Sequence, residues 1–486
     1  MITEDNKRIV ISSLIWKLME RIGSQGIQFI VQIILARLLL PEDFGLIAIV
    51  IVFTTFAQVF IQKGFNTALI QKKDADDLDF SSIFFLSIII SILIYFILFF
   101  TAPYIANFYG ISKLTSLIRV LSIILLFGSI YSVQMAYVAR YMLFKVLFRS
   151  SVVSILVSGT IGILLAYLDF GVWALVIQQI INQLIITVIL WFTIDWRPSF
   201  IFSLKRTKEL FSFGWKLLVS SLLNTLYLDI RTLIIGRIYT PSLLGIYNRG
   251  EQFPKIIVTN VDGSIQSVML PTLSSHQDDV IKMKTIVRRA IKSSTFLIMP
   301  AMVLLFIVSE PLIIIVLTDK WLASAPFLQL FAIAYAFIPI STTNAQAINA
   351  LGKSDIFLKL EIVKKIIGLT LLGISIQFGI FWIAFSMVLT NILSTAINAY
   401  PNKHLLNYGY LSQLIDILPI ILVSATTGMM IFPLRYIIFH PFYLLISQTM
   451  LGIIIYLLSS KLFRLDGYTY LFNTIKDLYY KRESSK

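Results

Sequence analysis

The sequence contains no cysteine among its 486 residues. It therefore has no disulfide framework and no thiolate metal site. Its three histidines, His276, His404 and His440, are far apart and show no ligand spacing, so a haem, zinc or redox centre has no support. We expect no cofactor and no metal.

Charge is also scarce. Charged residues make up 13% of the chain and hydrophobic residues 58%, and the mean hydropathy is +0.87. Soluble proteins carry about 25% charged residues, and a soluble fold of this size could not bury so much apolar surface. The composition therefore predicts an all-α polytopic membrane protein.

Apolar stretches long enough to cross a bilayer recur along the whole chain. They predict about 14 transmembrane helices, near residues 9–36, 44–62, 81–106, 114–137, 149–167, 172–194, 211–236, 251–271, 288–308, 325–350, 357–378, 380–400, 413–434 and 440–460. The connections between them leave no room for a soluble catalytic domain. Walker A, nucleophile-elbow and metalloprotease motifs are absent, so we expect no catalytic residues.

The net charge of +15 is distributed unevenly. With the N-terminus inside, most of the 40 basic residues fall on the inner side of the membrane. The even number of spans then places both termini in the cytoplasm. The positive charge is accounted for by topology, and no nucleic-acid partner is expected.

Two short patterns recur about 200 residues apart. Trp16-Lys17-Leu18 returns as Trp215-Lys216-Leu217, and Arg37…Pro41…Gly45 returns as Arg237…Pro241…Gly245. The interval corresponds to six spans, so the two copies run in the same direction. We predict an N-terminal six-helix lobe (1–200), a C-terminal six-helix lobe (201–405), and a last segment with helices 13 and 14 and a cytoplasmic tail (406–486).

Polar residues form stripes along the first, seventh and eighth spans at spacings of three and four residues. Charges inside a membrane are costly, so they favour a water-filled, net basic cleft that takes an anionic ligand. The alternative for such stripes is hydrogen bonding between helices. The candidate binding residues are Lys17, Arg21, Gln28, Gln32, Lys216, Asn224, Arg231 and Lys255, with Arg37, Arg237 and Arg249 at the outer mouth.

Several segments together resemble the Wzx-type polysaccharide flippases of bacteria. They are Leu35–Gly45, with the sequence LARLLLPEDFG, Gly64–Gln71, Ala102–Tyr109, Tyr247-Asn248-Arg249 and Ala350–Asp355. The resemblance covers nearly the whole chain and is strongest to the branch for colanic and teichuronic acid type exopolysaccharides. It places the chain in the multidrug/oligosaccharidyl-lipid/polysaccharide exporter superfamily.

The resemblance implies two six-helix lobes in a V with a central cavity and alternating access. It implies a bacterial cytoplasmic (inner) membrane location and an undecaprenyl-pyrophosphate oligosaccharide as substrate. Polysaccharide polymerase and export proteins are candidate partners. Coupling to a gradient of H⁺ or Na⁺ would use the carboxylates Glu20 and Asp262. The alternatives are a multidrug cation antiporter of the same superfamily and a membrane-embedded polysaccharide polymerase or ligase.

Overall fold

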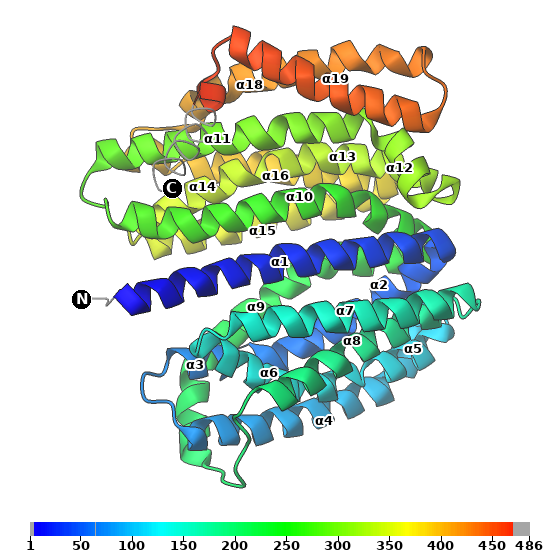
Figure 1. Cartoon of the computed structure of the whole chain (residues 1–486), viewed down its shortest axis with the longest axis vertical. Coiled ribbons are helices and arrows are strands. Elements are labelled where there is room, and N and C mark those ends of the chain that lie inside the picture. Colours follow the sequence, from blue (N-terminus) through cyan, green and yellow to red (C-terminus); the bar gives the residue numbers. More distant parts are fainter. Residues whose placement is uncertain (1–3, 64, 470–486) are drawn as a thin grey trace. The chain divides into compact units, whose positions relative to one another are not determined.

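The computed structural model describes residues 4–63 and 65–469, and every regular element in these residues is helical (Figure 1). The α-helices of the first half are α1 Glu4–Leu38, α2 Pro41–Gln62, α3 Phe65–Gln71, α4 Asp77–Tyr109, α5 Lys113–Leu121, α6 Ile124–Arg140, α7 Phe144–Tyr167, α8 Val172–Thr193 and α9 Leu204–Ile238. Those of the second half are α10 Pro241–Ser274, α11 Val280–Ile307, α12 Ser309–Leu317, α13 Ala325–Ala336, α14 Ile338–Ala350, α15 Ser354–Ser375, α16 Ile380–Ala399, α17 Asn402–Leu405, α18 Tyr410–Ile431 and α19 Pro441–Leu462.

Each of the fourteen predicted spans falls on a helix or on a pair of consecutive helices. Among residues 4–63 and 65–469, eleven segments are long and apolar enough to cross a membrane. The helices outside these eleven that match predicted spans are α1, α10 and α15, which carry several charged residues each. The all-helical membrane fold is therefore confirmed, while the count of fourteen stays a prediction. Two predicted spans are interrupted, at Ser122 between α5 and α6 and at Phe337 between α13 and α14.

The chain divides into two compact units, 1–245 and 246–486. In the first unit α1 packs along α7, while α9 packs on α2, α3 and α4. Small residues allow the close approach on α7, where a Cβ on Gly159 would lie 2.7 Å from Val31. The predicted domain limits at 200 and 405 follow the sequence repeat, and they stay predictions, as do the V-shaped arrangement and its cavity.

The two copies of the Pro-x-x-x-Gly pattern meet in the first unit. Pro41 and Pro241 open α2 and α10, where the missing N–H of proline costs nothing. A Cβ on Gly45 would lie 1.7 Å from the carbonyl oxygen of Pro241, and a Cβ on Gly245 would lie 2.0 Å from that of Pro41. Since the contact is reciprocal, neither position has room for a side chain.

We predict that Gly45→Ala destabilises the protein by about 3 kcal/mol, because a methyl group there must displace backbone atoms. The measurement is thermal unfolding of the purified protein in detergent. The matched control is Gly26→Ala, since a Cβ on Gly26 meets nothing within 4 Å and the helix gains a better helix former. Equal unfolding temperatures for Gly45→Ala and the wild type would contradict the prediction.

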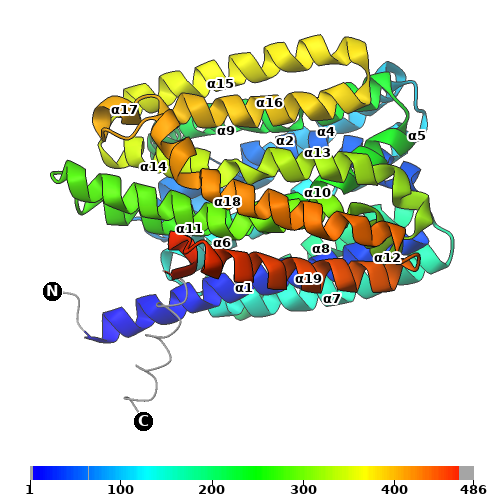
Figure 2. The ribbon, with the colours of Figure 1, turned by 90° about the horizontal axis from the view of Figure 1, so that it is seen from above.

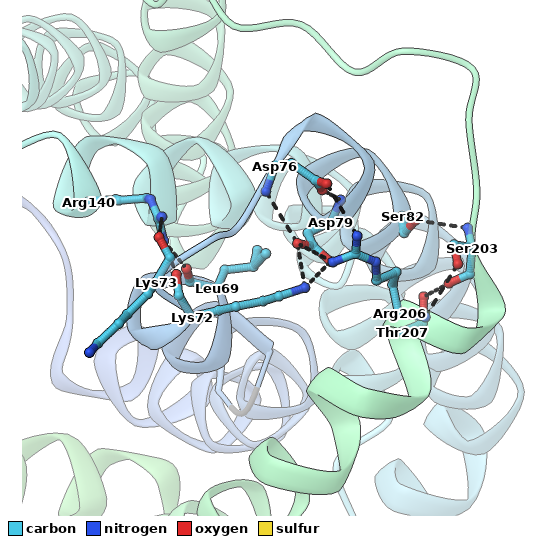
Figure 3. A network of polar contacts seen from close by, with 10 residues as sticks. All are labelled: Leu69, Lys72, Lys73, Asp76, Asp79, Ser82, Arg140, Ser203, Arg206 and Thr207. Carbon is cyan, nitrogen blue, oxygen red and sulfur yellow. Dashed lines mark hydrogen bonds and ion pairs between the residues drawn. The ribbon is translucent and has the colours of Figure 1, made fainter.

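A polar network ties the start of α9 to the start of α4 (Figure 3). The Asp79 carboxylate is fully buried, lies 2.7 Å from Lys72 Nζ and 3.6 Å from an Arg206 nitrogen, and accepts the backbone N–H of Asp76. The Asp76 side chain in turn caps α4. Its pKa is lowered because it accepts the backbone N–H of Asp79 and lies near Arg206.

Further bonds join the same segments. Arg140 donates to the carbonyl oxygens of Leu69, Lys72 and Lys73 at 2.6–2.9 Å, which anchors the end of α3 to α6 (Figure 3). The backbone N–H of Ser203 donates to Ser82 at 3.0 Å. The loops after α3, α6 and α8 therefore gather at one end of the first unit, which agrees with their predicted placement on one side of the membrane.

In the second unit α11 packs against α13, α14 and α18, and α18 and α19 lie side by side (Figure 2). Buried amides connect three of its elements: Asn344 of α14 donates to Gln413 of α18 at 2.8 Å, and Asn402 of α17 donates to Asn344 at 2.7 Å. Such amides favour helix association where no water is present to satisfy them.

Candidate functional site

Lys17 and Glu20 of α1 lie near residues of α7, the helix on which α1 packs. Lys17 is exposed, and its Nζ lies 5.3 Å from the centre of the Phe144 ring. Glu20 is half-buried, is hydrogen-bonded to Ser151 of α7 and lies close enough to Lys17 and Arg21 to attract both. The carboxylate thus offsets part of the positive charge, and one net positive charge remains on this part of α1.

Tyr131 of α6 also interacts electrostatically with Glu20. The partners Ser151 and Tyr131 were not predicted. Their sequence contexts, a run of serines and an aromatic residue inside an apolar span, carry no signal that distinguishes them from packing residues.

Gln28 and Gln32 continue the stripe on α1, and both are half-buried. On α9, Lys216 and Asn224 are exposed. Because α1 packs on α7 and α9 packs on α2, α3 and α4, these residues form two groups within the first unit. Their meeting in one cleft stays a prediction.

Arg231 differs from the other predicted residues of α9. It lies inside the candidate membrane span Gly214–Ile238, its exposed fraction is 9%, and its Nε and Nη2 atoms have no hydrogen-bond partner in the described part of the chain. A guanidinium left in this state costs free energy, because its lost hydration is not replaced. An anionic ligand would supply the missing acceptors.

In the second unit, Lys255 of α10 is exposed and its Nζ lies 3.4 Å from Glu251, one turn earlier. Glu251 also accepts a 2.6 Å hydrogen bond from the hydroxyl of Tyr335 on α13. Sequence reasoning missed Glu251, although its i,i+4 spacing from Lys255 was a usable signal. Asp262, two turns further along, accepts a 2.8 Å hydrogen bond from Gln266.

The three arginines predicted at the outer mouth have different surroundings. Arg37 and Arg237 are exposed, and Arg237 lies 5.1 Å from the centre of the Phe108 ring. Arg249 is buried, donates to Gln252 and lies 5.5 Å from the centre of the buried Trp321 ring. A cation stacked on an indole is stabilised within the protein, so Arg249 also has a structural explanation.

Comparison with known proteins gives one family. Residues 34–326 match the sequence model of a family described as "Polysaccharide biosynthesis protein". The chain is 29% identical over 310 residues to the teichuronic acid biosynthesis protein TuaB of Bacillus subtilis (strain 168), an alignment that covers 62% of this chain and 63% of that protein. The chain thus spans slightly less than two thirds of this relative.

Other relatives align over more of their length. The chain is 24% identical to the succinoglycan biosynthesis transport protein ExoT of Rhizobium meliloti (strain 1021), over 72% of this chain and 71% of that protein. It is 21% identical to the lipopolysaccharide biosynthesis protein WzxC of Escherichia coli (strain K12), over 87% of this chain and 88% of that protein.

Solved structures show the same fold. The lipid II flippase MurJ in an inward closed conformation matches with a TM-score of 0.76 and 17% identity, over 92% of this chain and 98% of MurJ. An inward-facing multidrug resistance transporter of the MATE family matches with a TM-score of 0.60 and 14% identity, over 82% of this chain and 95% of the transporter. At these identities the likeness concerns the fold.

Proposed function

The chain belongs to the polysaccharide biosynthesis protein family, and on that premise we propose that it is a flippase for lipid-linked oligosaccharides. Its substrate would be an undecaprenyl-pyrophosphate oligosaccharide, moved from the cytoplasmic to the outer leaflet for surface polysaccharide biosynthesis. This is transport, so no bond is made or broken in the substrate. The membrane would be the bacterial inner membrane, with both termini in the cytoplasm.

The observation that carries the proposal is Arg231, a buried guanidinium in a candidate membrane-spanning helix, two nitrogens of which lack a hydrogen-bond partner among the residues that the structure describes. A pyrophosphate supplies several charged acceptor oxygens to such a group. Lys17, Arg21, Lys216 and Lys255 would add charge compensation as the lobes alternate, and Gln28, Gln32 and Asn224 would bond sugar hydroxyls. The polyprenyl tail would remain in lipid beside α18 and α19.

A gradient of H⁺ or Na⁺ would drive the cycle through Glu20 and Asp262. The contact of Glu20 with Lys17 and Arg21 supports this role, since a change in its protonation alters the charge of the neighbouring binding residues. A multidrug cation antiporter is the second candidate, favoured by the MATE-like fold. The excess of basic over acidic residues among the predicted site residues favours the anionic substrate.

The test is flipping of a lipid-pyrophosphate oligosaccharide in proteoliposomes, with and without an imposed proton or sodium gradient. Lys17→Ala and Lys216→Ala should each lower the initial rate about tenfold, the effect of losing one charge-assisted interaction. The matched control is Lys208→Ala, an exposed lysine on the same helix as Lys216 but before its membrane span. Organic-cation efflux without flipping would instead identify the multidrug antiporter.

A further inference from the structure

A polar cavity lies in the second unit, apart from the predicted binding residues. It has a volume of about 380 Å³ and lies between the first half of α11 and the segment that follows α19. Three basic side chains line it, from Arg288, Arg289 and Lys292, together with three hydroxyl side chains, from Thr285, Ser293 and Thr469. Guanidinium, ammonium and hydroxyl donors are the groups that bind phosphate oxygens in proteins.

Two of these cations are held in place by carboxylates from other elements. Arg288 Nε donates to Asp416 of α18 at 2.7 Å, and Lys292 Nζ lies 3.3 Å from Asp416 and 2.7 Å from Asp466. The hydroxyl of Tyr408 donates to Asp416 at 2.8 Å, and burial, with this bond second, raises the pKa of Tyr408. The cavity wall is therefore pre-organised, which lowers the entropic cost of binding.

Positive charge exceeds negative charge around the cavity. The cavity is lined by three cations and one carboxylate, Asp466. The segment 280–292 contains five basic residues and no acidic one, and the carboxylates that contact it include Asp279, Asp416 and Asp466. The far wall passes close to α11 at Gly467, where a Cβ would lie 2.6 Å from Phe296. An anion is the ligand that this balance of charge favours.

The exposed apolar side chains near the cavity indicate the source of the anion. Leu462 and Phe463, just before the cavity segment, are 77% and 67% exposed, and Leu297 of α11 is 54% exposed. These apolar side chains mark a lipid-facing surface, so the cavity lies at its polar edge. We propose that it binds the phosphate of an anionic phospholipid headgroup, at the end of the unit predicted to face the cytoplasm.

The experiment measures binding of phosphatidylglycerol to the full-length protein in neutral detergent micelles, by native mass spectrometry, with phosphatidylcholine as the neutral comparison. Arg289→Gln should weaken phosphatidylglycerol binding about tenfold and leave phosphatidylcholine unaffected. Ser293→Phe fills the cavity without a change of charge and should have a similar effect. The control is Lys282→Gln, which removes an exposed cation of the same helix that does not line the cavity.

Three results would overturn the proposal. Unchanged phosphatidylglycerol binding in both Arg289→Gln and Ser293→Phe would exclude this cavity as the site. A loss of phosphatidylglycerol binding in Lys282→Gln as large as that in Arg289→Gln would indicate diffuse attraction to a basic surface. Competition by excess inorganic phosphate as strong as that by the lipid would identify a soluble phosphate as the ligand. Flipping is not measured, so the outcome is independent of the proposed transport function.

Discussion

Replacing Arg231 by leucine is expected to slow flipping strongly while the folded protein becomes more stable. A bidentate, charge-assisted pair with a phosphate contributes about 3 kcal/mol, so the loss of this residue should lower the initial flipping rate about 100-fold. Leucine also removes a buried group whose Nε and Nη2 find no acceptor within the described residues, and this removal should raise the free energy of unfolding by about 1–3 kcal/mol.

The two readouts separate a binding role from a structural one. The flipping rate is measured in proteoliposomes and the stability by thermal unfolding in detergent. Arg231→Lys keeps the charge but loses the planar fork, so we expect an intermediate rate. Lys208→Gln, which removes one cation from the same helix outside the membrane span, should leave both readouts unchanged. A large loss of stability in Arg231→Leu would show that the guanidinium holds the fold together.

The membrane helices could be predicted because each must contain an apolar run long enough to cross the bilayer. The interruptions within two of the predicted spans could not be predicted. Ser122, between α5 and α6, and Phe337, between α13 and α14, lie inside continuous apolar stretches where hydropathy carries no signal for an interruption. The short helices α3 and α12 were missed for a related reason, because they lie beside longer apolar segments and are too short to cross a membrane.

In the candidate site, the sequence likewise predicts which residues share a helix face but not which side chains of other helices contact them. The spacing of Lys17, Glu20 and Arg21 predicted one polar face of α1, and their mutual attraction agrees with it. The partner of Glu20, Ser151, follows it by 131 residues in the sequence, and only the packing of α1 on α7 identifies it. Arg249 is a second example. Its ring partner Trp321 is distant in the sequence, so no local pattern predicts the contact between them.

The network at Asp79 was not predicted either, because aspartates between two spans are typical of exposed loops. Because the Asp79 carboxylate is buried, its replacement is expected to lower the stability of the protein strongly. Asp79→Ala leaves Lys72 and Arg206 without their shared carboxylate in a partly buried place, and the loss of one partner from a buried ion pair costs about 3–5 kcal/mol. Thermal unfolding in detergent measures this loss.

Hydrogen exchange distinguishes a local role from a global one. Since Arg206 and Ser203 connect the start of α9 to α4, Asp79→Ala should increase amide exchange over residues 203–210 more than over the rest of α9. The control Asp74→Ala replaces an exposed aspartate in the loop just before α4, so it removes an equal charge and should change neither measurement. If Asp74→Ala and Asp79→Ala behaved alike, the net charge of the loop would explain the effect. A difference between them would show that the buried carboxylate holds the first turns of α9 against α4.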